Sequence, residues 1–386
     1  MIYLDYAAAA PVRKEVRKVV AEMEKYFANP SSTHYAGRKS KELLENSRER
    51  MRDLLNAEKR DKIIFTSSGT ESINLAIKGI THAYKKKGKH IITSKVEHKA
   101  VLETCKYLEQ EGFKITYIDV DKYGKVDLKE VKKAITKKTI LITIMYANNE
   151  VGTIQPIKEI AAIAKKKKVL FHTDACQAGH LDLDVQRLGV DLLTLNSNKI
   201  YGPKGAGLLY VKEGAKIEPS LHGGGQEYGL RSGTENFTAI AGFAKALELA
   251  QQEKGKENKR LQGLRDYFVK EVTKNIQNVS LSGHPTERLS NNVHLSFEGM
   301  EAETVLLYLN QQHIFASAGS ACNAHEIAVS HVLEAMKVPE KSARGSIRFS
   351  LGRHTSKKEV DKVVKVLTEI VSSLRRTVNF PETKTI

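Results

Sequence analysis

Lys199 is the residue of this chain whose type and position most directly suggest chemistry. It follows an apolar run, Val190–Leu195, that predicts a buried strand, and it precedes the turn signal Gly202–Gly205. A lysine at a strand end inside an α/β sheet is well placed to form a Schiff base with a carbonyl cofactor. The position alone is weak support, so the other reactive residues decide the interpretation.

Asp174 ends another predicted strand, 25 residues before Lys199. In open α/β sheets, ligands bind at the carboxyl ends of the strands, so both residues are expected at one site. A carboxylate there can keep a pyridine nitrogen protonated, and a protonated pyridine stabilises a carbanion at the Cα of a substrate. The alternative is that Asp174 only caps a helix.

The segment Ser67–Ser72 follows a predicted strand and opens a predicted helix. This pattern predicts an anion-binding cup, because the first backbone N–H groups of a helix are free to donate to an anion. Gly69 would let an anion approach the backbone closely, and Ser68 and Thr70 would add hydroxyl groups. An ordinary N-cap, with Glu71 complementing the helix dipole, explains the same pattern equally well.

Cys322 lies in a run of small residues, Ala316–Ala324, that has little packing value. A thiol in such a loop suits a nucleophile that must reach a substrate and then an external acceptor. Cys105 and Cys176, in a predicted helix and at a strand end, fit a packing role better. The 3 cysteines are too few and too scattered for a disulfide framework, and none has a metal-type Cys-x-x-Cys partner, so we expect a reducing cytoplasm and no metal.

Short apolar strands alternate with amphipathic helices over the first two-thirds of the 386 residues, which predicts a mostly parallel sheet covered by helices. The expected strands are Lys62–Thr66, His90–Ser94, Ile115–Val120, Ile140–Tyr146, Val169–Asp174, Asp191–Leu195 and Gly207–Val211. The remainder indicates a smaller α+β domain. We therefore expect a large α/β domain over 14–255, and a small domain formed by 1–13 and 256–386.

The order of the anion cup, Asp174 and Lys199 resembles the layout of fold-type I enzymes that depend on pyridoxal 5'-phosphate (PLP). More closely, the chain resembles the NifS/IscS-type cysteine desulfurases of the longer-loop class (group I), which belong to the class V aminotransferases. The matching segments are Ile2–Tyr6, Asn29–Ser32, Phe65–Ser72, Thr93–Leu102, Asn148–Gly152, Asp174–Gln177, Lys199–Gly205, His222–Thr234, Ser317–Cys322 and Ser346–Arg353. The resemblance covers nearly the whole chain and implies the fold-type I architecture.

The resemblance also implies roles for residues around the cofactor ring. Lys199 matches the Schiff-base lysine, and Asp174 matches the partner of the pyridinium nitrogen. His98 matches the imidazole that stacks on the ring as an acid or base, although a histidine early in a helix is more often a cap or a surface residue. Gln177 and Asn149 match the pair near the phenolic oxygen of the cofactor.

Further roles concern the phosphate, the substrate and the sulfur. Matches to phosphate-binding positions are Ser68, Gly69, Thr70, Asn196, Asn198 and, for the cofactor of a neighbouring subunit, Thr234, which implies a homodimer. Arg348, together with Asn149, matches the residues that bind the substrate carboxylate. Arg348 lies in a strand-like run, where an unpaired charge is costly. Cys322 matches the cysteine that carries a persulfide.

Two neighbours of Lys199 depart from the family pattern. Asn198 stands where the family usually has histidine, and Asn196 stands where it usually has a small hydroxyl residue. Asparagine can donate a hydrogen bond to a phosphate but carries no charge. We therefore expect PLP to bind, but less tightly.

These matches predict a PLP-dependent L-cysteine desulfurase that makes L-alanine and leaves a persulfide on Cys322 for an acceptor protein, in iron–sulfur cluster assembly or in tRNA or cofactor thiolation. One alternative keeps the cofactor but acts on selenocysteine or cysteine sulfinate. Another is a weakly active homologue that serves as a partner-binding scaffold. Retention of Lys199, Asp174, His98 and Arg348 together with Cys322 argues against the scaffold.

The net charge of +17 raises the question of an acidic partner or RNA. Lysine runs such as Lys85–Lys87 and Lys165–Lys168 are also common on the exposed helix ends of proteins from hot environments. No aromatic residues interleave with them as a base-stacking platform, so we do not expect direct nucleic-acid binding. No apolar window reaches the length of about 18 residues that a membrane span needs, so no membrane partner is expected.

Overall fold

The computed structural model describes residues 1–319 and 329–377. Its main sheet has seven strands in the order β2-β8-β7-β6-β5-β3-β4, and every neighbouring pair is parallel except the two pairs that involve β8. The strands are β2 (Lys62–Thr66), β3 (His90–Ser94), β4 (Lys114–Ile118), β5 (Thr139–Thr143), β6 (Leu170–Asp174), β7 (Leu192–Asn196) and β8 (Gly207–Val211). The expected α/β class with a mainly parallel sheet is confirmed.

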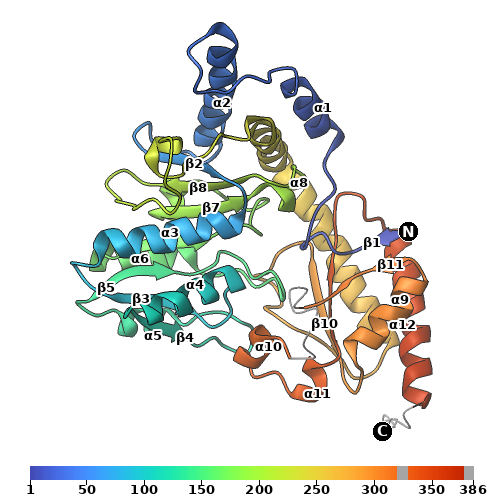
Figure 1. Cartoon of the computed structure of the whole chain (residues 1–386). Helices are drawn as coiled ribbons and strands as arrows, with labels where there is room; N and C mark the ends of the chain where they lie inside the picture. The colour runs from blue at the N-terminus through green and yellow to red at the C-terminus, as the bar shows by residue number, and fades with distance from the viewer. Residues whose placement is uncertain (320–328, 378–386) are drawn as a thin grey trace.

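Helices cover both faces of this sheet (Figure 1). Successive residues of each strand point to opposite faces, so each strand contributes to two apolar cores. Ile64, Ile91 and Leu141 pack against α3 and α4, while their neighbours Phe65 and Ile92 pack on the other face. The helices around the sheet are α1 (Lys14–Met23), α2 (Tyr35–Leu54), α3 (Gly69–Tyr84), α4 (Lys99–Gln110), α5 (Leu128–Ala134), α6 (Ile157–Lys167) and α7 (Val185–Leu188). Two short 3-10 turns, η1 (Ser197–Lys199) and η2 (Glu227–Gly229), follow β7 and β8.

A second, antiparallel sheet has four strands in the order β12-β13-β10-β9. Its strands are β9 (Val279–Leu281), β10 (Asn292–Phe297), β12 (Ser317–Ala318) and β13 (Ser346–Ser350), and beside it β1 (Ile2–Tyr3) pairs with β11 (Ile314–Phe315). Its helices are α9 (Ala302–Gln311), α10 (His331–Ala335), α11 (Glu340–Ala343) and α12 (Lys357–Thr377). Ile2 and Leu4 from the start of the chain lie in the apolar core of this region.

The long helix α8 (Phe237–Asn275) belongs to both regions (Figure 1). Phe243 and Leu247 in its first half pack in the core of the seven-stranded sheet, and Phe268 and Val272 in its second half pack in the core of the small sheet. The domain boundary predicted at residue 255 therefore falls inside a continuous helix, and the division into 14–255 and the rest stays a prediction.

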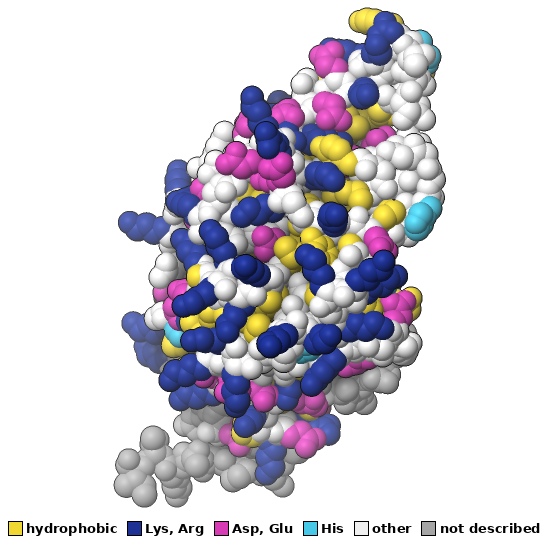
Figure 2. All heavy atoms as spheres, turned by 90° about the vertical axis from the view of Figure 1, so that its left-hand side faces the viewer, with side chains coloured by type: hydrophobic (Ala, Val, Ile, Leu, Met, Phe, Trp, Pro, Cys, Tyr) yellow, Lys and Arg dark blue, Asp and Glu magenta, His cyan; other side chains and the backbone are white. Residues whose placement is uncertain are grey.

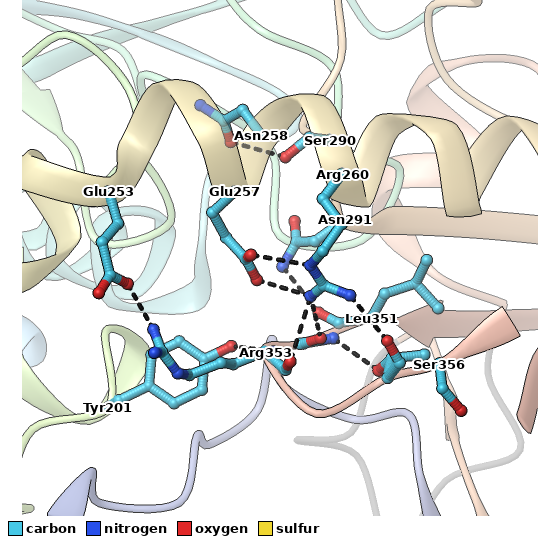
Figure 3. A network of polar contacts seen from close by, with 12 residues as sticks. Tyr201, Glu253, Glu257, Asn258, Arg260, Ser290, Asn291, Leu351, Arg353 and Ser356 are labelled. Carbon is cyan, nitrogen blue, oxygen red and sulfur yellow. Dashed lines mark hydrogen bonds and ion pairs between the residues drawn. The ribbon is translucent and has the colours of Figure 1, made fainter.

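Polar side chains of α8 hold the loop that follows β13, as Figure 3 shows. Arg260 donates to the carbonyls of Gly352 and Thr355 at 2.9 and 2.8 Å and is itself paired with Glu257. The backbone N–H of Arg353 donates to the hydroxyl of Tyr201 at 2.8 Å. This network ties β13 to the segment that follows Lys199.

The expected strand bounds differ from the observed ones by a few residues. The largest difference concerns Ile140–Tyr146, where β5 ends at Thr143 and Ile144–Tyr146 continue as non-strand backbone. These three residues are buried, and the N–H of Tyr146 donates to the carbonyl of Asp174, so their apolar pattern looks like strand although the ladder has ended. Within the described ranges, no helix has the length and apolarity that a membrane crossing requires.

Candidate active site

A cavity of about 250 Å³ opens at the carboxyl ends of the parallel strands, where the two sheets meet. Its walls contain the predicted residues Gly69, Thr70, His98, Asn149, Asp174, Gln177, Asn196, Lys199 and Arg348. Further lining comes from Ala7, Ala8, Ile73, Lys99, Met145, Ala147, Glu150, Cys176, Gly319 and His331. The fold thus brings together most of the residues that the sequence singled out.

Lys199 is presented by the 3-10 turn η1, directly after β7. Its Nζ donates a hydrogen bond of 2.5 Å to the carbonyl of Ala8. Gln177 donates through Nε2 to the carbonyl of the preceding residue, Ala7, at 3.0 Å. The start of the chain therefore forms one wall of the cavity and orients both side chains.

Asp174 is the last residue of β6, the strand next to β7, and is almost fully buried. Its Oδ1 accepts the N–H of Cys176 at 3.0 Å, so the carboxylate is fixed by its own turn. The thiol of Cys176 lies beside it, and burial, together with the charge of Asp174, raises the pKa of that thiol well above its ordinary value. Cys176 is therefore a neutral thiol in the cavity wall.

His98 caps the N-terminus of α4, because its Nδ1 accepts the N–H of Ala100 at 3.1 Å. His98 therefore both caps α4 and lines the cavity. Burial lowers the pKa of His98, and Lys199 lowers it further, whereas the charge of Asp174 opposes the shift. The result is a neutral imidazole whose Nδ1 lone pair is occupied, which assigns the proton to Nε2.

The predicted anion cup lies at the N-terminus of α3, a helix of 16 residues. Ser68 is the N-cap and accepts the N–H of Glu71 at 3.3 Å, so its side chain serves the helix and is absent from the cavity lining. A Cβ added to Gly69 would lie 2.6 Å from Sγ of Cys176, so only glycine fits there. The carboxylate of Glu71 pairs with Arg231 at 2.7 Å and accepts the N–H of Ser67 at 2.7 Å, and Gly69 and Thr70 are the residues of the cup that line the cavity.

Asn196 and Asn198 have different surroundings. Asn196 ends β7 and lines the cavity, with Nδ2 3.5 Å from the position of a Cβ built on Gly69, so an amide donor adjoins the cup. Asn198 does not line the cavity, and its buried Oδ1 has no hydrogen-bond partner in the described part of the chain. The structure therefore joins Asn196, but not the side chain of Asn198, to the anion cup.

Arg348 enters the cavity from β13 of the small sheet and is almost fully buried. Its Nη1 donates to the carbonyl of Asn149 at 3.0 Å, and its Nη2 pairs with Oδ1 of Asp5 at 2.9 Å. Its Nε has no partner among the described residues. The arginine expected to need a carboxylate partner thus has one within the chain and keeps donor capacity for a second.

The remaining predicted residues are Thr234 and Cys322. Thr234 is exposed in the connection between β8 and α8 and is absent from the lining. Cys322 lies outside the described residues, in 320–328. On either side of that segment, Gly319 lines the cavity and Ser330 donates to Oε2 of Glu150 at 2.5 Å.

Several buried polar residues of the site were not predicted. Glu150 accepts from Ser330, and its Oε2 lies 2.9 Å from the position of a Cβ built on Gly319. His294, on β10 opposite Arg348, has its Nε2 3.0 Å from the same position, and neither ring nitrogen has a partner among the described residues. The only sequence signal was a histidine inside the alternating run Asn292–Phe297, which does not distinguish it from a core histidine with hydrogen-bond partners.

Glu97, next to His98, is a third buried polar residue that the sequence did not single out. Its carboxylate accepts the hydroxyl of Ser94 and the N–H of Met145 at 2.6 and 3.0 Å, and burial raises its pKa to about 8. His331, in the cavity wall, contacts the carbonyl of Glu97 at 2.9 Å. These contacts fix the backbone that carries His98.

The donor set fits PLP. The start of α3 and Asn196 offer donors for a phosphate, Asp174 offers a buried carboxylate for a ring nitrogen, and Lys199 offers an amine. The helix end, the carboxylate and the amine are the three chemical groups that this cofactor needs from a protein.

Comparison with known proteins gives one family. The chain matches the aminotransferase class-V family over residues 2–363. It is 51% identical to "Cysteine desulfurase IscS" of Dictyoglomus turgidum, over 97% of this chain and 95% of that protein, and 51% identical to the protein of the same name from Methanosarcina thermophila, over 97% and 93%.

Solved structures agree with the sequence match. A "NifS-like protein" superposes with a TM-score of 0.91 at 37% identity, covering 96% of this chain and 99% of that one. A structure titled "SspA in complex with cysteine" superposes with a TM-score of 0.81 at 37% identity, covering 92% and 100%. The chain belongs to the aminotransferase class-V family of PLP-dependent enzymes, among the NifS/IscS-type proteins.

Proposed function

We propose that this protein is an L-cysteine desulfurase, which converts L-cysteine to L-alanine and transfers the sulfur to an acceptor protein. The observation that carries the proposal is one cavity in which Lys199 and Asp174, from neighbouring strands of one sheet, lie with Arg348 from the other sheet. Relatives about half identical over nearly the whole chain bear the name cysteine desulfurase, which supports the choice of substrate.

In this proposal the cavity holds PLP with Gly69, Thr70 and Asn196 at the phosphate, Asp174 at the ring nitrogen, and Gln177 and Asn149 at the phenolic oxygen. Bound PLP supplies a carbonyl for the substrate amine and an electron-withdrawing ring that acidifies the substrate Cα. Arg348 binds the substrate carboxylate through two N–H groups, which fixes the plane of the amino acid. Lys199 Nζ takes the proton from Cα, and His98 Nε2 carries a proton near the substrate sulfur.

We assign the sulfur transfer to Cys322. Its thiolate attacks the sulfur of cysteine, so that an S–S bond forms on Cys322, the Cβ–S bond of the substrate breaks, and Cβ gains a proton to become the methyl group of alanine. The position of Gly319 in the cavity wall, three residues before Cys322, supports this assignment. Cys105 and Cys176 do not suit the role, because burial raises the pKa of both thiols.

We propose a homodimer, because Thr234 is exposed and does not line the cavity of its own chain. The threonine that it matches in the family binds the phosphate of the cofactor in a neighbouring subunit. We also propose a cytoplasmic protein. Its free thiols Cys105 and Cys176 suit a reducing compartment.

The test uses purified protein. Wild type should show the visible absorption band of bound PLP, form alanine from cysteine, and gain one sulfur atom on the Cys322 peptide by mass spectrometry. Lys199→Ala should lose the band, whereas Cys322→Ser should keep it and lose alanine formation. Alanine formation that survives in Cys322→Ser would favour selenocysteine or cysteine sulfinate as substrate, and a colourless wild type would reject the proposal.

A further inference from the structure

Lysines gather at the edge of the main sheet opposite the cavity, where the parallel strands begin. Lys62 and Lys114 begin β2 and β4, and Lys89, Lys138 and Lys168 stand just before β3, β5 and β6. Lys212 follows β8, which is antiparallel and therefore ends at the same edge. Hydrogen bonds between backbones join neighbours in this row, from Lys114 to Lys89 at 2.8 Å and from His90 to Lys138 at 3.0 Å. We call these six residues the basic row.

The basic row extends across nearly the whole sheet. Neighbouring strands lie about 4.8 Å apart, so seven strands place their first and last members roughly 29 Å apart. Helices that return to this edge add Lys85–Lys87 after α3 and Lys165–Lys167 in the last turn of α6. Figure 2 shows Lys and Arg side chains over much of this face.

None of the lysines of the basic row or of these two helix ends forms an ion pair within the described ranges 1–319 and 329–377. By contrast, Lys95 and Lys125 elsewhere on the surface each pair with a carboxylate. Acidic residues at the same strand ends have other partners: Asp191 accepts the N–H of Phe171 at 2.9 Å, Asp61 accepts the N–H of Glu213 at 2.8 Å, and Glu213 pairs with Arg60 at 3.4 Å. The basic row and the two helix ends therefore gather positive charge on one edge of the sheet.

Two structural explanations account for only part of this cluster. Lysines in the last turns of α5 and α6 complement the helix dipoles and need no ligand. Thermostabilising lysines act through ion-pair networks, which are missing here. Lys89, Lys114 and Lys138 precede or begin strands and cap no helix, so neither explanation covers them.

We propose that the basic row binds the phosphate backbone of nucleic acid, without regard to sequence. Lysine ammonium groups on flexible stems contact phosphates as point charges, and a continuous row of them can follow a chain of phosphates. A protein partner is disfavoured, because interface cores are depleted in lysine and built on apolar anchors. None of the large apolar side chains exposed in the described residues belongs to the strand beginnings of this edge or to the ends of α3, α5 and α6, although the exposed ring of Tyr228 lies 6.0 Å from Nζ of Lys62.

This inference is independent of the proposed function and reverses the expectation from the sequence, which could not show that the lysines converge on one edge. Because the cavity opens at the other edge of the sheet, nucleic acid bound to the row leaves the cavity accessible. Cysteine turnover and nucleic-acid binding should therefore be independent of each other.

The test measures the fluorescence anisotropy of labelled oligouridylate and oligothymidylate, each of about 20 nucleotides, with the holoenzyme over a series of salt concentrations. Both should bind with Kd on the order of 10 μM at about 50 mM salt, and log K should fall linearly with log salt. The variant K89Q/K114Q/K138Q should weaken binding about tenfold or more and make the salt slope shallower by about 2.

The matched control is K358Q/K362Q/K365Q on α12, which removes the same charge from exposed lysines of the small region and should leave binding nearly unchanged. Absence of binding at low salt would overturn the proposal. So would equal losses in the two variants. Displacement of the oligonucleotides by an equal charge of poly-L-glutamate would overturn it as well, and would assign the row to an acidic protein segment.

Discussion

The guanidinium of Arg348 pairs with the carboxylate of Asp5 at 2.9 Å, although the two residues lie 343 positions apart in the chain. The pair joins the first residues of the chain to the small sheet at the wall of the cavity. Asp5 thereby neutralises a buried cation before any substrate carboxylate arrives.

Asp5→Asn should destabilise the protein and weaken cysteine binding. The variant keeps an acceptor oxygen at this position but removes the negative charge that faces the buried guanidinium of Arg348, which we expect to lower the free energy of unfolding by about 1–3 kcal/mol. KM for cysteine should rise more than kcat falls, measured by steady-state kinetics beside denaturant unfolding. As a control, Asp119→Asn breaks the exposed pair with Lys95 and should cost less than about 0.5 kcal/mol. Equal losses in the two variants would contradict the argument.

The acid limb of the pH profile should report His98. Burial first, and then the charge of Lys199, lowers the pKa of this imidazole from its ordinary 6.5, so it stays neutral until the pH falls below that value. We expect kcat/KM to decline only below about pH 6.5, and His98→Gln to lower kcat by about 10²–10⁴ and remove that limb. His331→Gln, in the same cavity wall, should retain the limb. A limb that persists in His98→Gln would assign it to another group.

Stability should fall as the pH decreases below neutrality. Burial lowers the pKa of His172 to about 4 and of His294 to about 3, and the nearby Arg288 and Arg348 add to the shift at His294. Unfolded histidines titrate near 6.5, so between about pH 4 and 6.5 the unfolded chain binds more protons, and the stabilisation present above 6.5 is lost.

Urea unfolding at several pH values measures this slope. His294→Asn should flatten it, because the variant has no proton to gain at that position on unfolding. The control His313→Asn changes an exposed residue whose left-handed backbone also suits asparagine, and it should leave the slope as in wild type. An unchanged slope in His294→Asn would mean that other groups dominate the acid response.

Gly69→Ala should loosen the cofactor through its contact with Cys176. The added Cβ would lie 2.6 Å from Sγ, so either the thiol or the start of α3 must shift. We expect PLP affinity to fall about tenfold or more, followed by the visible band of bound cofactor during titration with PLP. Cys176→Ala in the same chain removes the clashing atom and should restore most of the affinity, as a double-mutant cycle can show. No recovery would place the strain elsewhere.

Alkylation should separate the thiols. Burial raises the pKa of Cys105 to about 12 and that of Cys176 well above its ordinary value, so neither is a thiolate near neutrality. We expect iodoacetamide to modify Cys322 in the native protein, to react slowly with Cys322→Ser, and to reach all 3 cysteines after unfolding. Rapid native modification of Cys176 would refute its assignment as an inert wall residue.

The sequence predicted those parts of the site that local rules control. Asp174 ends β6, Lys199 follows the neighbouring parallel strand β7, and the start of α3 follows β2, so the alternation of strands and helices was enough to bring them to one edge. Arg348 was identified by its resemblance and by the cost of a charge in an apolar strand.

The rest depends on how separate segments pack. Nothing local links Asp5 to Arg348, or Glu150 to Ser330, because these contacts form only when the small sheet docks on the large one. The alternation of residues in β10 does not reveal that both ring nitrogens of His294 lack a hydrogen-bond partner among the described residues. The basic row arises from single lysines at separate strand beginnings, which become neighbours only through the strand order.

The helix α8 has a consequence for dissecting this enzyme. Since Phe243 and Phe268 of one continuous helix fill two different cores, a cut at residue 255 would divide the helix and leave each fragment with an uncovered apolar stripe. Fragments divided there are poor candidates for separate expression. The smallest autonomous unit of this architecture contains both sheets.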